Sequence, residues 1–134
     1  MITKQITTSR RCEMIDVTRQ IEQAVKQKGI ATGMVIVYVP HTTAAVTINE
    51  NADPDVKHDL LLKLEKLIPK HEAFYQHDEG NSDSHLKTSL VGSTVTVLIE
   101  SGRLVLGRWQ GIYFCEFDGP RQRQMHVKLV SFDP

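Results

Sequence analysis

The segment from His77 to His85 concentrates side chains that can do chemistry. Its residues, His-Asp-Glu-Gly-Asn-Ser-Asp-Ser-His, include two imidazoles, three carboxylates and one carboxamide. A segment with so little to bury is a poor core, but it suits a divalent cation or a proton transfer. The spacing of the two histidines matches no standard zinc motif, so spacing alone is weak support for a metal.

His41 is the natural third member of a histidine site. It follows Pro40, which interrupts a β-branched run and can re-aim the next side chain. A loop that folds back over a helix N-terminus would bring His77 and His85 together. We therefore predict a metal or catalytic triad of His41, His77 and His85, with zinc or magnesium as the divalent ion. The remaining histidines are interpreted as ordinary surface residues: His58, His71 and His126.

Two carboxylates lack a structural explanation and are candidate catalytic groups. Glu50 stands at the end of an expected strand, between two asparagines. Asp59 is expected at the edge of an apolar helix face, where a half-buried carboxylate needs a partner and takes a shifted pKa. Asp53 and Asp55, in contrast, are explained by helix capping.

Polar residues of the C-terminal third could contact a ligand. Arg121 and Arg123 follow a Gly-Pro turn and could grip a phosphate bidentately, and solvated turn residues are the equal alternative. Trp109 is expected in the core or in a subunit interface, and its neighbour Gln110 is a candidate ligand contact. The chain has no Gly-rich phosphate loop, no G-x-S-x-G and no C-x-x-C pair, so several large enzyme classes lose support.

Apolar periodicity predicts the elements that must position these groups. One helix begins after Asp16 or Thr18 and ends at Gly29, a second is capped by Asp53 and ends before Pro69, and a third covers 83–91. Residues 70–82 are expected to form a long loop. Alternation and β-branched runs predict strands at 2–8, 33–39, 42–49, 93–100, 103–106, 111–117 and 124–132. This order favours an α+β domain with a largely antiparallel sheet.

Composition limits the class of protein. The 134 residues suffice for one domain, 1–134, and the formal net charge of zero predicts no long-range attraction to nucleic acid or to an anionic membrane. We expect no membrane span and no secretory signal. Cys12 and Cys115 match no metal spacing. Two reduced thiols in a cytoplasmic protein are the favoured interpretation, with a structural disulfide as the alternative.

Five motifs in the same order resemble the YjbQ family, also called the secondary thiamine-phosphate synthase family, over nearly the whole chain. The matching segments are His41–Ala45, Ile48–Val56, Gly80–Lys87, Gly102–Gly111 and Glu116–Arg121. The resemblance implies an α+β fold with a sandwich-like β core, a homotrimer and a weak thiamine-phosphate synthase activity. Where the family often has alanine near the second histidine, this chain has Ser82 and Ser84.

The family's motif residues map onto the candidate groups of this chain. The roles we assign are catalysis for Glu50, Asp59 and His85, and metal binding for His41, His77 and His85. Ligand binding is assigned to four further residues: Asn49, Asn81, Gln110 and Arg121.

Three functions remain open from the sequence. The first is a thiamine-phosphate synthase-like transferase, which must stabilise a departing diphosphate. The second is a metal-dependent hydrolase that acts on a phosphorylated small molecule. The third is a trimeric module that binds a metabolite or a metal without turnover.

Overall fold

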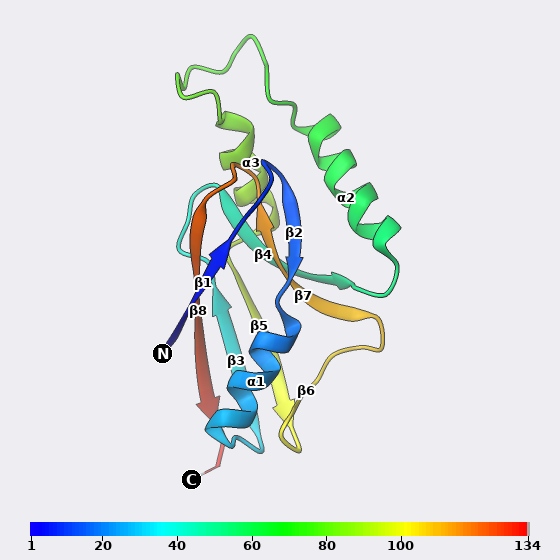
Figure 1. The fold of residues 1–134 in the computed structure, drawn as a ribbon, viewed down its shortest axis with the longest axis vertical. Helices are drawn as coiled ribbons and strands as arrows, with labels where there is room; N and C mark the ends of the chain where they lie inside the picture. The colour runs from blue at the N-terminus through cyan, green and yellow to red at the C-terminus, as the bar shows by residue number, and fades with distance from the viewer. Residues whose placement is uncertain (134) are drawn as a thin grey trace.

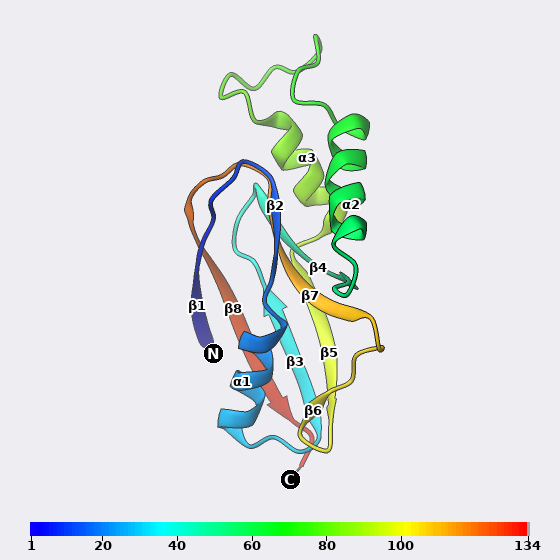
Figure 2. The same cartoon turned by 45° about the vertical axis from the view of Figure 1, so that its right-hand side comes forward.

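Two antiparallel sheets, drawn in Figures 1 and 2, form the frame of the molecule in the computed structural model, which describes residues 1–133. The five-stranded sheet has the order β1 (Ile2–Thr7), β8 (Gln122–Ser131), β3 (Gly33–Tyr38), β5 (Thr94–Glu100) and β6 (Arg103–Leu104). The three-stranded sheet has the order β2 (Glu13–Asp16), β7 (Gln110–Glu116) and β4 (Ala44–Glu50). The helices are α1 (Thr18–Lys28), α2 (Pro54–Leu67) and α3 (Ser82–Val91). The expected α+β architecture is therefore confirmed.

The main core lies between the inner faces of the two sheets. Strand alternation turns Val35 and Val37 of β3 inward, where they meet Phe114 of β7. Helix α1 closes one end of this core with Ile21, and its buried side chains recur at helical spacing. Gly29 ends α1 in the left-handed conformation, with φ of 67°, as the sequence predicts.

Helices α2 and α3 cover the outer face of the three-stranded sheet. A second apolar cluster is formed there by Met14, Tyr113 and Cys115, and Leu60 and Leu64 of α2 pack against it. The outer face of the five-stranded sheet carries no helix in Figures 1 and 2. None of the helices in residues 1–133 combines the length and the apolar character that a membrane crossing requires.

The helix α2 begins where the sequence predicts. The Asp53 side chain accepts a hydrogen bond of 2.9 Å from the backbone N–H of Asp55, and Pro54 occupies the first turn. The first helix is fixed similarly, because the Asp16 carboxylate accepts a bond of 2.9 Å from the backbone N–H of Thr18.

Several boundaries differ from the sequence expectation. Strand β2 was not predicted, because its four residues, Glu-Met-Ile-Asp, give no clear strand signal and become a strand only by pairing with β7. Strand β4 begins at Ala44 rather than at 42, and β6 ends at Leu104 rather than at 106. These edges are set by pairing with neighbouring strands, which local sequence does not encode.

Buried charges anchor α3, which carries the second histidine of the cluster. The Asp83 side chain is 0% exposed and accepts hydrogen bonds from Arg11, at 2.9 and 3.1 Å, and from buried Lys87, at 3.1 Å. The Ser84 hydroxyl donates to the carbonyl of Phe117 at 2.6 Å. Asp83 therefore has a structural role: it holds helix α3 in place. Although it belongs to the polar segment from His77 to His85, its carboxylate is not available to a substrate.

A second buried ion pair, between Arg123 and Glu116, lies next to the start of β4. The Arg123 guanidinium donates to both carboxylate oxygens of Glu116 and to the Thr43 hydroxyl, and the hydroxyl of Thr8 donates to Glu116 at 2.7 Å. Burial alone would raise the pKa of Glu116, but these hydrogen bonds outweigh it and hold that pKa below its usual range. Arg123 is thus a buried structural cation, which corrects both interpretations of it as a solvated turn residue and as a phosphate ligand.

Candidate functional site

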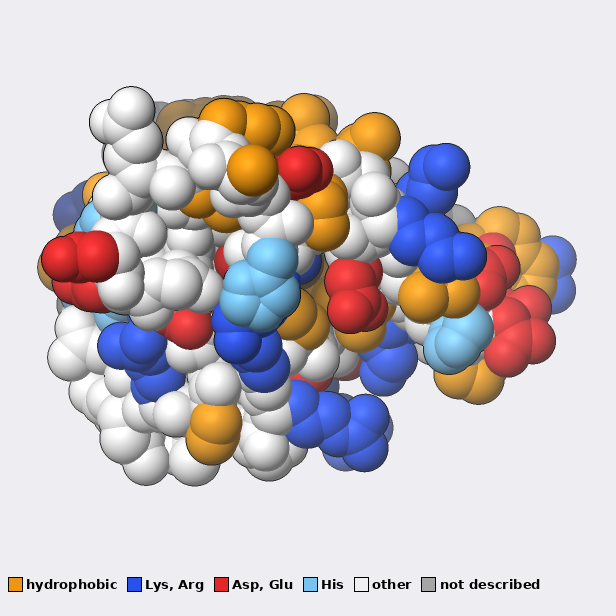
Figure 3. Space-filling model, turned by 90° about the horizontal axis from the view of Figure 1, so that it is seen from above, with side chains coloured by type: hydrophobic (Ala, Val, Ile, Leu, Met, Phe, Trp, Pro, Cys, Tyr) orange, Lys and Arg blue, Asp and Glu red, His pale blue; other side chains and the backbone are white. Residues whose placement is uncertain are grey.

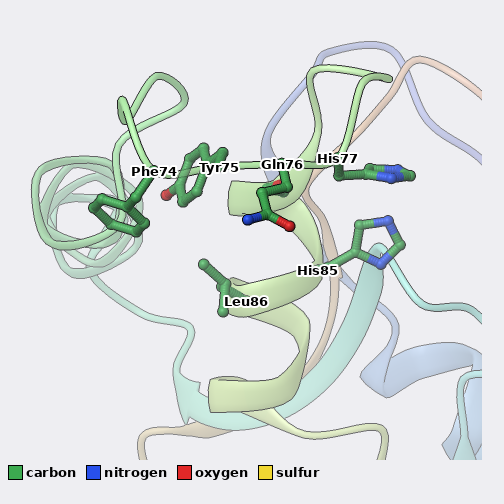
Figure 4. Close-up of a pocket in the computed structure, with 7 residues that line it drawn as sticks. Phe74, Tyr75, Gln76, His77, His85 and Leu86 are labelled. Atoms are coloured by element: carbon green, nitrogen blue, oxygen red, sulfur yellow. The ribbon is translucent and has the colours of Figure 1, made fainter.

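His77 and His85 lie against each other, as Figure 4 shows. Their ring centroids are 5.5 Å apart and their planes meet at 88°. His85 projects from α3, and His77 comes from the loop between α2 and α3, which folds back over that helix. This confirms the expectation that the loop brings the two imidazoles together.

An apolar groove borders this histidine pair. Its volume is about 550 Å³, and we call it the aromatic groove; Figure 4 shows most of its lining, which is Phe74, Tyr75, Gln76, His77, Ser82, His85 and Leu86. Phe74 and Tyr75 contact each other edge to face, with centroids 5.2 Å apart. The Tyr75 hydroxyl donates to the carbonyl of Pro69 at 2.9 Å, which fixes this ring. The groove can therefore receive a flat, largely apolar group.

A second, polar hollow adjoins His85. Its volume is about 340 Å³, and we call it the hydroxyl-lined hollow; it is bounded by His41, Thr42, His85, Thr88, Ser89, Gly92 and Ser93. Thr88 is only 7% exposed, and its hydroxyl has no hydrogen-bond partner in the described part of the chain. His85 lines both spaces.

His41 also lines this hollow, and one hydrogen bond fixes its imidazole. Its Nε2 accepts a hydrogen bond of 3.0 Å from the backbone N–H of Gln124. Burial lowers the pKa of His41, and the nearby Arg123 charge lowers it further. The ring is therefore neutral near pH 7, and its proton resides on Nδ1.

The predicted three-histidine metal site is not formed within one chain. Among residues 1–133, no three His, Cys, Asp or Glu side chains are placed to hold a metal ion together. His41 explains part of this, because its Nε2 accepts from Gln124 and its Nδ1 carries the proton, so the neutral ring offers no free lone pair. His77 Nε2 faces Glu79 at 3.7 Å. Residues 1–133 of a single chain thus do not form a complete ligand set for a metal ion, and metal binding stays a prediction.

Arg121 and Asn81 meet at Asp118 rather than at the histidines. The Arg121 guanidinium donates to the Asp118 carboxylate and carbonyl, both at 2.7 Å, and the Asn81 amide donates to the same carboxylate at 2.8 Å. The phosphate grip predicted for Arg121 would have to compete with these bonds. The side-chain oxygen of Asn81 is buried without a partner in residues 1–133, so Asn81 keeps one free acceptor.

The remaining predicted residues lie at the opposite end of the three-stranded sheet. Glu50 pairs with Gln110, and Asn49 pairs with Gly111. The seven residues of β4 span about 20 Å at ~3.4 Å per residue, so this end is remote from His41, which precedes the strand. The Asn49 and Gln110 side chains each accept a bond from nearby backbone, that of Glu50 and of Gly107, both at 2.7 Å.

Asp59 is not half-buried as the sequence predicts. Its side chain is 78% exposed and pairs with His58 at 3.0 Å on the open side of α2. The apolar stripe of α2 turns Leu60 and Leu64 toward the sheet and leaves Asp59 outside the buried face. In a single chain it therefore shares no site with the histidines.

Seen from above, the end of the molecule that carries α3 mixes the two signs of charge. Figure 3 shows Lys and Arg, Asp and Glu, and histidine side chains interspersed over this face, with hydrophobic ones among them. No single-sign field covers the face shown, in keeping with a net charge of zero. A ligand that binds to this face is therefore selected by the side chains that it contacts and not by a long-range charge.

Sequence reasoning missed the hydroxyls of Thr88 and Ser89 and the rings of Phe74 and Tyr75. A signal for the first two was present, because they follow His85 by three and four residues and so share its face of the helix. No comparable signal marks the two aromatic residues, since their loop has no repeating period.

The fold is shared with known proteins. A family model for the UPF0047 protein YjbQ-like group matches residues 2–131. The chain belongs to this family. The UPF0047 protein YugU of Bacillus subtilis is 52% identical over 129 residues, which are 96% of this chain and 98% of that protein. The UPF0047 protein MJ1081 of Methanocaldococcus jannaschii is 52% identical over 95% of this chain and 91% of its own length.

A solved structure has the same fold as this UPF0047 member. A YjbQ/UPF0047 family protein of Clostridium acetobutylicum is 51% identical and superimposes with a TM-score of 0.95, covering 97% of this chain and all, 100%, of that one. Membership confirms the resemblance drawn from the five motifs. It extends over β1 to β8 and therefore includes both ends of β4 and the whole of α3.

Proposed function

We propose that this protein is a small-molecule enzyme whose substrate reacts against His85. The observation that carries the proposal is that His85 lines both the aromatic groove and the hydroxyl-lined hollow. A molecule with a flat apolar part and a polar part, lying across the two spaces, would place its central atoms beside this imidazole. Small-molecule sites commonly combine an apolar lining with a few convergent polar groups in this way.

His77 and His85 are suited to move a proton at that position. Imidazole is the side chain that most often serves as general acid or base near neutral pH. The edge-to-face contact at 5.5 Å between the ring centroids keeps both rings at the rim of the groove. One ring can exchange a proton with the substrate while the second orients it. The Thr88 and Ser89 hydroxyls, one helical turn further along α3, face the polar part of the substrate.

The reaction we favour is the transfer or hydrolysis of a phosphorylated small molecule, with thiamine-phosphate synthesis as the first reaction to test. Either reaction must stabilise negative charge on a leaving group, for which hydrogen-bond donors near His85 are available. A divalent metal would supply the same stabilisation as a Lewis acid. Because residues 1–133 of one chain do not bring three metal ligands together, no step is assigned to a metal.

We further propose a homotrimer in which one copy meets the next head to tail. Exposed apolar side chains flank both ends of β4: Phe74, Leu86 and Leu90 beside the histidines, and Val105 and Trp109 beside Gln110. A contact between two different patches propagates and closes into a ring when the rotation permits. Such a ring would bring Glu50 of one copy toward His85 of another and so unite the predicted site residues.

The central test compares His85→Ala with His58→Ala in a synthase assay and in a hydrolase assay with a panel of phosphate esters. His58 is an exposed histidine on α2 and serves as the matched control. We expect His85→Ala to lose about 10²–10⁴-fold in rate, and His58→Ala to behave as the parent protein. Equal activity of both variants would refute the proposal. Binding without any turnover would indicate a metabolite-binding module instead.

Metal content of the purified protein should be measured in the same preparations by elemental analysis. Tightly bound zinc would favour hydrolysis by activated water, whereas weakly held magnesium would favour diphosphate chemistry. Loss of that metal in His77→Ala, but not in His58→Ala, would locate it at the histidine pair.

A further inference from the structure

The hydroxyl-lined hollow offers hydrogen-bond donors whose acceptors are missing. His41 directs its Nε2 lone pair to Gln124, so the Nδ1–H of the neutral ring remains as a donor. The Thr88 hydroxyl, in a side chain 7% exposed, is not hydrogen-bonded within residues 1–133. A buried hydroxyl without a partner destabilises the fold, so its retention here points to a ligand that completes it.

Three backbone carbonyls around the same hollow already accept hydrogen bonds. The carbonyl of Thr88 accepts from the N–H of Gly92 at 2.8 Å, and the carbonyl of Gly92 accepts from Val46 at 3.1 Å. The carbonyl of Ser93 accepts from Val39 at 2.8 Å. These three carbonyls are therefore not free to accept a hydrogen bond from a ligand.

No carboxylate lines the hollow, and a cation stands behind it. The lining consists of imidazoles, hydroxyls and backbone. Arg123 is close enough to His41 to lower the pKa of that imidazole, and it acts more strongly than Glu116, its paired anion. Each free polar side chain of the hollow can donate a hydrogen bond. This combination suits a ligand group that only accepts hydrogen bonds.

We propose that the hydroxyl-lined hollow binds the oxyanion of the substrate, a phosphate or a carboxylate, through the Nδ1–H of His41 and the hydroxyls of Thr88 and Ser89. The proposal rests on the proposed function for the placement of the reacting atoms at His85. It moves the oxyanion contact away from Arg121, whose guanidinium is engaged by Asp118, and gives His41 the role of a neutral donor in place of a metal ligand.

The first experiment titrates the protein with inorganic phosphate, and separately with acetate, while recording NMR spectra of the histidine rings. Saturable shifts of the His41 and His85 rings are expected with at least one of the two anions. Phosphate alone would identify a phosphoryl group, and acetate alone a carboxylate. Long-range ¹⁵N spectra should show His41 protonated on Nδ1. Protonation on Nε2, or no saturable shift with either anion, would overturn the proposal.

Thr88→Val tests the orphan hydroxyl without changing its shape. We expect the variant to weaken binding of the anion that binds the parent protein by about tenfold or more, as for loss of a hydrogen bond to a charged group. The variant should fold well, because it removes an unpaired buried hydroxyl. Thr96→Val, an exposed threonine of β5, is the matched control and should bind as the parent does. Equal affinity in Thr88→Val and the parent would refute the assignment.

The outcomes separate this proposal from the proposed function. If His85→Ala abolishes turnover while Thr88→Val leaves anion affinity unchanged, the enzyme centre stands and the oxyanion assignment fails. If Thr88→Val weakens anion binding while His85→Ala remains fully active, the hollow is a binding site and the reacting centre lies elsewhere.

Discussion

The two ends of strand β4 carry the two halves of the predicted site, and they are built differently. At the end that begins with Ala44, α3 is held by buried ion pairs. His85 of this helix lines two hollows. At the end that finishes with Glu50, the polar side chains of Asn49 and Gln110 bond to neighbouring backbone. The histidine end keeps two buried side-chain oxygens without a partner in residues 1–133, whereas the side-chain oxygens of Asn49 and Gln110 already accept a bond each.

This difference indicates which end of β4 can bind and convert a substrate within a single chain. A side chain with its hydrogen bonds already made must break them to bind a substrate, while an orphan group gains by binding. The two orphan oxygens found in residues 1–133 belong to Asn81 and Thr88, both on or next to α3. Chemistry is therefore expected at the histidine end, and the Glu50 end is expected to contribute only through a neighbouring copy.

The largest effect is expected from Asp83→Ala, which removes the anchor of the histidine end. The change leaves the buried Lys87 ammonium and Arg11 without their anion, so the free energy of unfolding should fall by about 3–5 kcal/mol. Urea unfolding measures it. Asp78→Ala, an exposed carboxylate of the same segment, should change stability by less than about 0.5 kcal/mol. A small effect of Asp83→Ala would mean that buried ion pairs do not stabilise the histidine end more than the Glu50 end is stabilised.

Mixing two inactive variants tests whether the ends meet between copies. If the head-to-tail trimer is correct, His85→Ala and Glu50→Gln should each lose activity, and mixed trimers prepared by unfolding and refolding together should recover a part of it. Light scattering should give the mass of three chains, and Trp109→Glu should lower it. Full activity of Glu50→Gln alone would place the whole site at the histidine end of one chain.

Acid should destabilise the molecule through the carboxylates of its two buried ion pairs. Burial by itself would raise the pKa of Asp83, but its bonds to Arg11 and Lys87 prevail and lower it from the usual 3.8, and the pKa of Glu116 is lowered from 4.5. Their stabilisation is present above those ordinary values and is lost as pH falls through the lower folded-state pKa values. Unfolding between about pH 6 and about pH 2 should show this loss, with a shallower slope in Asp83→Asn. An identical slope would refute the assignment.

The smallest effect is expected for Asp59→Asn. Asp59 and His58 form an exposed pair, and such pairs contribute about 0–1 kcal/mol. The melting temperature should therefore remain within the error of calorimetry. A clear loss of stability would show that Asp59 is buried in the assembled protein, as the sequence had suggested.

Much of the frame could be predicted from the sequence because its signals are local. The capping of α2 by Asp53, the end of α1 at Gly29 and the alternation of β3 are properties of a few neighbouring residues. The site could be predicted only in part. The proximity of His77 and His85 follows from their shared segment, whereas the separation of Glu50 from His41 depends on β4 being extended over its full length.

The sequence by itself determined the helices, most of the strands, the family and the identity of the reactive side chains. These depend on residue type and short-range periodicity, which are written directly in the chain. Only the tertiary structure decided which polar groups are free. Arg123 became a buried partner of Glu116, His41 became a neutral hydrogen-bond donor, and Thr88 was left with an unpaired hydroxyl beside His85. Hydrogen-bond partners distant in sequence made these choices, and local residue patterns carry no record of them.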